Sequence, residues 1–163
     1  MQPHPDSNDK IALKCVVITV SDTRSFADDH SGNLIKSLLR DAGHLTVGYQ
    51  IIPDLPGEII AQLTTWQKVD VIILNGGTGI SKRDQTVDVV EVVLEQILPG
   101  FGELFRMLSY QTIGSRAMAS RAIAGVYQEK LIFCLPGSTN GVKLAMEKLI
   151  IPELIHLNQQ IKQ

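Results

Sequence analysis

The chain has 163 residues, of which 44% are hydrophobic and 20% are charged. This composition is typical of one globular domain and excludes a wholly disordered protein. A formal net charge of -2 gives no general attraction to nucleic acid or to an anionic membrane, so any anionic ligand must be held by local groups.

No apolar stretch reaches membrane-spanning length, and the first residues lack the apolar segment of a signal peptide. We therefore expect a cytoplasmic protein. Cys15 and Cys134 each lie in an apolar run, where a reduced thiol behaves as a small hydrophobic side chain, so both are predicted to be core residues. The histidines are scattered and no CxxC or HExxH occurs, so no structural zinc site is predicted.

The N-terminal part of the chain predicts a tail followed by a buried strand. Residues 1–12 are polar and contain proline, which indicates a flexible tail, and we expect residues 13–163 to form a single α/β domain. The β-branched run at 15–20 is typical of a strand that is buried on both faces of a parallel sheet. Polar residues 21–24 follow it.

Two helices and two strands are predicted next. Ser31 is positioned to cap a helix that Gly43 ends, and residues 47–52 form the second strand. Pro56 suits the first turn of a helix whose apolar stripe ends at Trp66. The third strand is expected at 69–74.

A glycine-rich segment at 75–86 separates the third strand from the next helix. Thr86 can cap this helix, whose inward-facing residues would extend to Ile97 before Pro99-Gly100 stops it. A further helix at 101–108 is unusually apolar, which core packing and a subunit interface together would explain.

The C-terminal third predicts one clear strand and one helix. Residues 113–125 have ambiguous periodicity, whereas 131–135 form a short strand that leads into a turn at 136–141. The last helix carries apolar residues at helical spacing, and Pro152 is expected to kink or divide it. Strands that alternate with helices along the chain predict an α/β fold with a largely parallel sheet.

Polar loops follow four of the predicted strands, at 21–24, 53–54, 75–86 and 136–141. Ligands of such folds bind outside the carboxyl ends of the strands, so we expect these loops to form one site. The glycine loop is neither a Walker A motif nor a complete Rossmann fingerprint. Its glycines can direct several backbone N–H groups at a phosphate, with Arg83 as a phosphate clamp and Asp84 as a magnesium ligand.

Each of these segments also has a purely structural explanation. The glycine loop would serve as a tight connection, Arg83-Asp84 as a solvated charge pair, and Asp54 as a turn residue. Ser21, Asp22, Ser138 and Thr139 would act only as caps. Their joint position at strand ends favours a shared ligand site.

From about residue 14 to about residue 157 the chain resembles the molybdenum cofactor biosynthesis B proteins, and more broadly the molybdopterin-binding domain shared with molybdopterin adenylyltransferases. The matching segments are 19–22, 29–32, 52–54, 76–79, 83–86, 99–103, 105–109, 120–122 and 135–138. Asn75 stands where a threonine is usual before the two glycines. Some members of the B branch lack the arginine and threonine beside the aspartate and are regarded as catalytically silent, whereas this chain retains Arg83, Asp84 and Thr86.

The resemblance implies a three-layer α/β/α sandwich with a mostly parallel sheet, assembled as a homotrimer or homohexamer. It implies transfer of AMP from Mg-ATP to the terminal phosphate of molybdopterin, with release of pyrophosphate. Asp54 and Asp84 would be the catalytic and Mg²⁺-binding pair. The implied substrate- and nucleotide-binding residues are Ser21, Asp22, Gly76, Gly77, Thr78, Gly79, Arg83, Thr86, Pro136, Gly137, Ser138 and Thr139.

Two other functions fit the same residues. The chain would be a catalytically silent molybdopterin-binding or carrier protein of the same pathway if it retained the pterin without adenylylating it. It would be an assembly protein, handing pterin to a molybdenum-insertion enzyme, if its function depended on the apolar helix at 101–108 and not on the two aspartates.

Overall fold

The computed structural model describes residues 11–163. Most of the expected tail therefore lies outside the described residues, and Ile11, at its end, packs against the core. Within residues 11–163 no helix has both the length and the apolar character that crossing a membrane requires.

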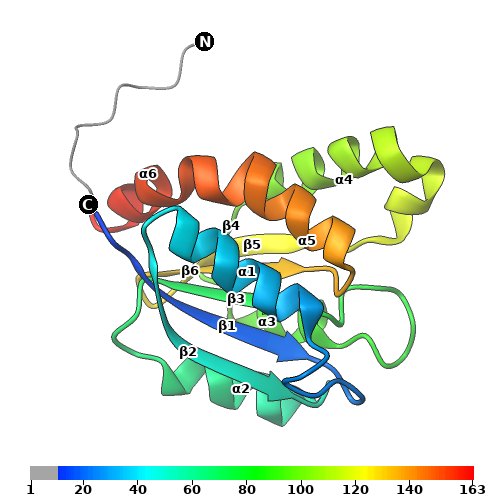
Figure 1. The fold of residues 1–163 in the computed structure, drawn as a ribbon, viewed down its shortest axis with the longest axis horizontal. Helices are drawn as coiled ribbons and strands as arrows, with labels where there is room; N and C mark the ends of the chain where they lie inside the picture. Colours follow the sequence, from blue (N-terminus) through cyan, green and yellow to red (C-terminus); the bar gives the residue numbers. More distant parts are fainter. Residues whose placement is uncertain (1–10) are drawn as a thin grey trace.

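One six-stranded sheet forms the centre of the molecule, with strand order β2-β1-β3-β6-β5-β4 (Figure 1). Strands β1 (Lys14–Val20), β2 (Leu45–Ile52), β3 (Val71–Asn75) and β6 (Lys130–Leu135) run parallel to one another. Strand β5 (Ile123–Tyr127) is antiparallel to β6 and pairs in turn with the short β4 (Gln96–Ile97). The sheet is thus mostly parallel, as the alternating pattern predicts.

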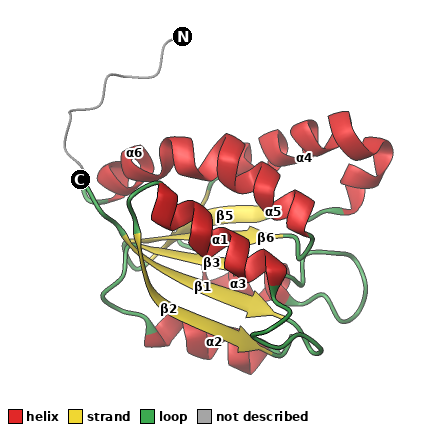
Figure 2. Ribbon diagram, in the orientation of Figure 1, coloured by secondary structure: helices red, strands yellow, loops and turns green. Residues whose placement is uncertain are grey.

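Helices cover both faces of the sheet (Figure 2). Helices α1 (His30–Asp41), α4 (Pro99–Ile113), α5 (Thr139–Ala145) and α6 (Ile151–Ile161) lie on one face. Helices α2 (Pro56–Thr65) and α3 (Thr86–Val93) lie on the other, and each face has its own hydrophobic cluster. This arrangement confirms the three-layer α/β/α fold.

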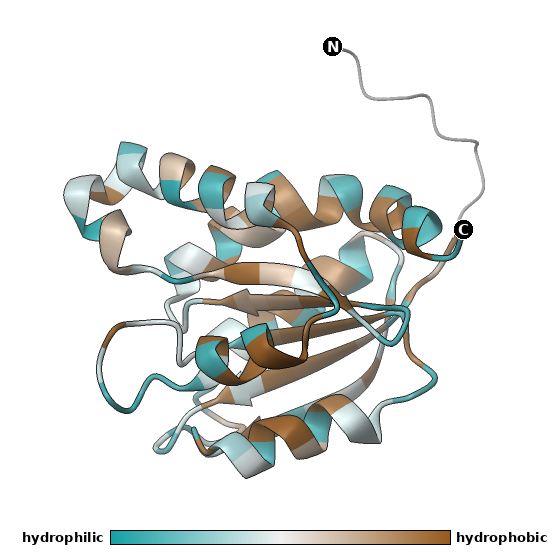
Figure 3. Cartoon of the chain, turned by 180° about the vertical axis from the view of Figure 1, so that it is seen from behind, coloured by the Kyte–Doolittle hydropathy of each residue, from teal (hydrophilic) through white to brown (hydrophobic). Residues whose placement is uncertain are grey.

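The central strands are almost entirely apolar, whereas the helices mix apolar and polar residues (Figure 3). Cys15 and Cys134 are free and wholly buried among these strands, which confirms their expected core position. Burial, with a contribution from the charge of Asp70, raises the pKa of the Cys15 thiol to about 12, and burial also raises that of Cys134. Both thiols are therefore protonated at neutral pH and poorly nucleophilic.

The predicted caps of α1 and α3 are wrong. Asp29 caps α1, because its carboxylate accepts from the Gly32 N–H, and Ser31 is the second residue of the helix. Thr86 is the first residue of α3 and not its cap, and its buried hydroxyl has no partner within residues 11–163. The Ser31 hydroxyl donates to the Gly137 carbonyl instead, and the Thr86 hydroxyl is packed against Gly77.

The region after α3 also differs from the expectation. Helix α3 ends at Val93, and Ile97 lies in β4, where 41% of the residue is exposed. Pro99 begins α4 and does not stop the preceding helix, which agrees with the preference of proline for the first helical turn. The ladder between β4 and β5 overrides the apolar periodicity that suggested a longer α3.

The ambiguous segment 113–125 contains the end of α4, a 3₁₀ helix at Gly114–Ala119 and the start of β5. Gly125 suits β5 because an added Cβ would lie 2.3 Å from the Gln96 carbonyl oxygen of the neighbouring strand. A π-helical turn at Met146–Ile150 divides the last helix just before Pro152, in agreement with the expected interruption.

Candidate functional site

The four polar loops meet at one edge of the sheet, because the strands that precede them are parallel. The Asp54 N–H donates to Asp22 Oδ1 at 3.1 Å and so joins the loops after β1 and β2. The Gly76 N–H donates to the Leu135 carbonyl at 2.9 Å and joins the loops after β3 and β6. The expected common site is therefore present as a geometric arrangement.

Residues 76–79, called here the glycine loop, need glycine for two separate reasons. Gly76 and Gly77 have φ angles of +103° and +71°, in the left-handed region that other residues resist. There is also no space for a side chain at Gly77, where an added Cβ would lie 2.1 Å from Thr86 Oγ1 and 2.7 Å from Asp54 Oδ2. The loop thus lies directly against Asp54 and the start of α3.

Three carboxylates gather beside this loop. Asp54 is partly buried and accepts from the Gln85 N–H, with N···O distances of 3.3 and 3.4 Å. Burial raises the pKa of Asp54, the Gln85 hydrogen bond opposes this rise, and the charges of Asp84 and Asp22 raise the pKa further. Asp54 lies against Gly77 and Asp84 against Gly79, so two negative charges lie along the same loop, which favours a nearby cation.

Asp84 is held by its own loop. Its Oδ2 atom accepts from Ser81 N at 3.0 Å and from Ser81 Oγ at 2.7 Å. The same carboxylate lies beside Gly79, where an added Cβ would be 2.8 Å from Asp84 Oδ2. The glycine loop and Asp84 thus form one compact unit.

Arg121 is a residue of this site for which the spacing of polar residues gave no sign. Its Nε donates to the Gly79 carbonyl at 2.8 Å and its Nη2 to the Asp84 carbonyl at 2.9 Å. Its Nη1 pairs with Asp88 at 2.8 Å, and its backbone N–H donates to the Thr78 carbonyl. One guanidinium therefore spans the loop from the glycines to the first turn of α3. The sequence offers one signal for Arg121, because it lies in 120–122, one of the segments that carry the family resemblance.

A cleft of about 750 Å³ opens beside the glycine loop. Its walls are the glycine loop, the turn after β6, the C-terminal half of α4 with the 3₁₀ helix, and α5 with the π-helical turn that follows it. The predicted site residues that line it are Gly76, Gly77, Thr78, Gly79, Asp84, Pro136, Gly137 and Ser138. Arg116, Lys143 and Lys148 add positive charge to the same walls.

A separate groove of about 500 Å³ lies between α2 and α3. Its lining includes the exposed apolar side chains of Ile60 and Val92 and also Lys82. Asp84 lines both this groove and the cleft. Two ligands that occupied the two hollows would therefore meet beside Asp84.

The other predicted site residues lie around these hollows and not in their linings. Ser21 Oγ accepts from the Thr23 and Arg24 N–H groups and so shapes its own loop. Thr86 is buried behind the glycine loop, and Thr139 contacts Ser31 on the far side of the turn. Arg83 is exposed and lines neither hollow, and the arginine that bonds the loop carbonyls is Arg121.

Comparison with known proteins identifies the family. A family model described as a probable molybdopterin binding domain matches residues 16–156. The chain belongs to this family. The matched residues include the glycine loop, both aspartates and the turn after β6, so the molybdopterin binding domain family covers the whole candidate site.

Individual relatives agree with this assignment. The chain is 48% identical over 153 residues to the molybdenum cofactor biosynthesis protein B of Bacillus cereus, covering 91% of this chain and 90% of the relative. It is similar to a crystal structure of a molybdenum cofactor biosynthesis protein B, with a TM-score of 0.91, 46% identity and coverage of 94% and 98%. The crystal structure of the tungsten cofactor synthesizing protein MoaB from Pyrococcus furiosus follows, with a TM-score of 0.84, 37% identity and coverage of 93% and 98%.

Proposed function

We propose that this chain acts in molybdenum cofactor biosynthesis by binding molybdopterin and adenylylating it with Mg-ATP. The observation that carries this proposal is the position of Asp84, which lines both the cleft and the groove and lies, like Asp54, against the glycine loop. A reaction that joins two phosphorylated substrates requires that both are bound side by side and that charge is stabilised at the point where they meet. The pathway is supported by the relatives, which are named as molybdenum cofactor biosynthesis proteins.

In this reaction an oxygen of the terminal molybdopterin phosphate forms a bond to the α-phosphorus of ATP. The bond between that phosphorus and the bridging oxygen of the leaving pyrophosphate breaks. The substrate supplies the nucleophile, so the protein has to position the phosphates and stabilise charge. The glycine loop and the turn after β6 would bind phosphate oxygens through backbone N–H groups. Lys82, which lines the groove, and the exposed Arg83 next to it in the sequence would neutralise developing charge.

Asp54 and Asp84 fit the Mg²⁺ that this reaction implies. Mg²⁺ binds proteins through one or two carboxylates and takes further oxygen ligands from substrate phosphates. Burial, with a contribution from the charge of Asp84, raises the pKa of Asp54, which is the electrostatic condition that a cation relieves. Within residues 11–163 no group of three or more His, Cys, Asp or Glu side chains is placed to hold a metal ion. When bound, the ion supplies charge neutralisation at the nucleotide phosphates.

The experiment is a pyrophosphate-release assay with purified protein, molybdopterin, ATP and Mg²⁺. We expect Asp84→Asn to keep molybdopterin binding and to lower the release rate by about a hundredfold or more, because a charge that acts in the transition state is removed. Asp41→Asn is the matched control, since Asp41 is an exposed carboxylate at the end of α1. Undiminished release in Asp84→Asn contradicts the role given to Asp84.

The same assay separates the alternatives. Retention of molybdopterin without any pyrophosphate release identifies a carrier protein. The exposed apolar side chains of α4, which include Leu104, Met107, Tyr110 and Ile113, support assembly into a homotrimer or homohexamer and offer a surface to a molybdenum-insertion enzyme. Substitutions confined to this face would abolish pathway function while leaving release intact if the protein acts only in assembly.

A further inference from the structure

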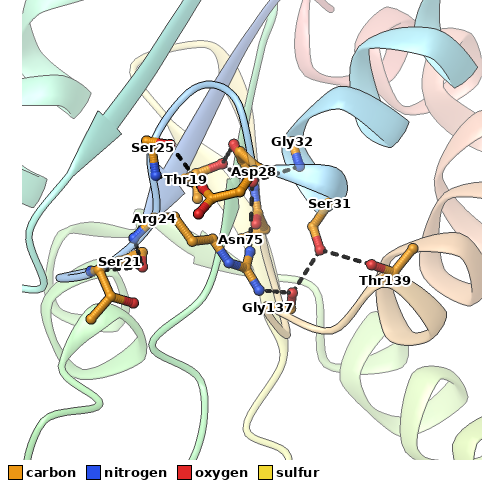
Figure 4. A network of polar contacts seen from close by, with 12 residues as sticks. Thr19, Ser21, Arg24, Ser25, Asp28, Ser31, Gly32, Asn75, Gly137 and Thr139 are labelled. Carbon is orange, nitrogen blue, oxygen red and sulfur yellow. Dashed lines mark hydrogen bonds and ion pairs between the residues drawn. The ribbon is translucent and has the colours of Figure 1, made fainter.

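Two side-chain donors bind the same backbone carbonyl in the turn after β6 (Figure 4). Arg24 Nη2 donates to the Gly137 carbonyl at 2.8 Å, and Ser31 Oγ donates to the same oxygen at 2.7 Å. Arg24 comes from the loop after β1 and Ser31 from the first turn of α1. Neither residue lines the cleft, whereas Gly137 and Ser138 do.

The direction of the carbonyl determines the direction of the next N–H. In a trans peptide the C=O and N–H bonds point to opposite sides, and residues 11–163 contain no cis peptide bond. With the Gly137 oxygen directed at Arg24 and Ser31, the Ser138 N–H is directed away from them, and Ser138 itself lines the cleft. A reversal of this peptide would present a carbonyl oxygen to an anionic ligand and repel it.

A buried carboxylate anchors Arg24. Asp29 is 0% exposed and lies 3.6 Å from Arg24 Nη1. Thr19 Oγ1 donates to Asp29 at 2.6 Å, the Tyr49 hydroxyl also donates to it, and its other oxygen accepts from the Gly32 N–H at 3.1 Å. These bonds satisfy the carboxylate and leave it little freedom, so the attached guanidinium is held in one place.

The anchor also reaches the glycine loop. Asn75 Nδ2 donates to Thr19 Oγ1 at 2.9 Å, and Asn75 directly precedes Gly76 (Figure 4). Strands β1 and β3 and helix α1 therefore share one buried polar network with the turn.

We propose that Arg24, anchored by Asp29 and assisted by Ser31, is the positioning residue that presents the Ser138 N–H to a phosphate of the ligand. This role rests on the proposed function, because it takes the ligand of the cleft to be phosphorylated. Arg24 acts through the Gly137 peptide and does not touch the ligand. Arginine suits the task because its planar fork donates to the carbonyl and pairs with the carboxylate at the same time.

The test compares Arg24→Met and Ser31→Ala with matched controls on the same helix or beside it. Arg40→Met removes an exposed arginine and Ser37→Ala a serine of α1. The dissociation constants of molybdopterin and of AMP are measured separately by calorimetry, without turnover. We expect Arg24→Met and Ser31→Ala each to raise the dissociation constant of at least one of these ligands about tenfold, which corresponds to the loss of one hydrogen bond to a charged group. We expect no change in the controls and partial recovery in Arg24→Lys.

A second measurement distinguishes positioning from general stability. The ¹⁵N amide resonance of Ser138 responds to hydrogen bonding at the preceding carbonyl, so it should shift in Arg24→Met and Ser31→Ala and not in the controls. Ser31→Ala keeps the test open if Arg24→Met does not fold. Equal affinities for both ligands in Ser31→Ala and the unmodified chain, with an unmoved Ser138 resonance, overturn the inference.

The outcome also separates this inference from the proposed function. Tight molybdopterin binding that depends on Arg24, without pyrophosphate release, supports the positioning role and rejects adenylylation. Pyrophosphate release with affinities that do not depend on Arg24 or Ser31 does the reverse. Failure of the unmodified chain to bind either ligand rejects both.

Discussion

Gly77→Ala tests whether the glycine loop depends on close contact with the residues behind it. The φ angle of +71° costs an alanine about 1–2 kcal/mol. The added Cβ would lie 2.1 Å from Thr86 Oγ1, so the neighbours must move by roughly 1 Å, which adds about 1–3 kcal/mol of overpacking. We therefore expect the free energy of unfolding to fall by about 2–5 kcal/mol in total.

Gly43→Ala is the matched control, because Gly43 has a φ of +87° with no atom within 4 Å of an added Cβ. Its free energy of unfolding should fall only by the cost of the left-handed backbone conformation, about 1–2 kcal/mol. Urea unfolding followed by circular dichroism measures both variants, and the double variant Gly77→Ala with Thr86→Ala should recover part of the loss. Equal destabilisation of the two single variants would refute the close-contact argument.

Three further outcomes follow from individual side chains. The raised pKa of Asp54 means that its ionised form weakens the fold, so Asp54→Asn should be more stable than the unmodified chain at neutral pH, and the gain should vanish below the ordinary pKa of 3.8; a gain that is constant with pH contradicts this. His44 Nδ1 accepts from the Leu13 N–H at 3.2 Å, and burial lowers the pKa of His44 below 6.5. The stability that His44 contributes is therefore present above pH 6.5 and lost as the pH falls through the lowered pKa. His44→Asn keeps a hydrogen-bond acceptor that does not titrate, so its free energy of unfolding should fall less on acidification. If urea unfolding shows the same pH dependence of stability in both proteins, this role of His44 is contradicted. Arg121→Met should speed amide hydrogen exchange in the glycine loop about tenfold or more, because charge-assisted bonds are lost, while Arg40→Met leaves the exchange rates unchanged.

The positions of the buried strands and their loops were predictable because they depend on local patterns. The β-branched run of β1 and the apolar run of β3 indicate strands buried on both faces, and parallel strands place the following loops at one edge. Asp54 and Asp84 were therefore identified as neighbours although 30 residues separate them in the sequence.

Helix boundaries and caps were less predictable, because they depend on competition between nearby groups. Asp29 caps α1 in place of Ser31, whose hydroxyl donates to the Gly137 carbonyl 106 residues away. The end of α3 and the start of α4 depend on the pairing of β4 with β5, which no local periodicity encodes.

The sequence by itself determined the α/β class, the buried strands and the four loops that carry the candidate ligand groups, because apolar runs and turn residues act over a few positions. Only the tertiary structure decided which cations hold those loops. Arg121 bonds the Gly79 carbonyl 42 residues away and Arg24 the Gly137 carbonyl 113 residues away. Such contacts follow from the strand order β2-β1-β3-β6-β5-β4, and that order is set by the packing of the whole sheet and not by the residues next to either arginine.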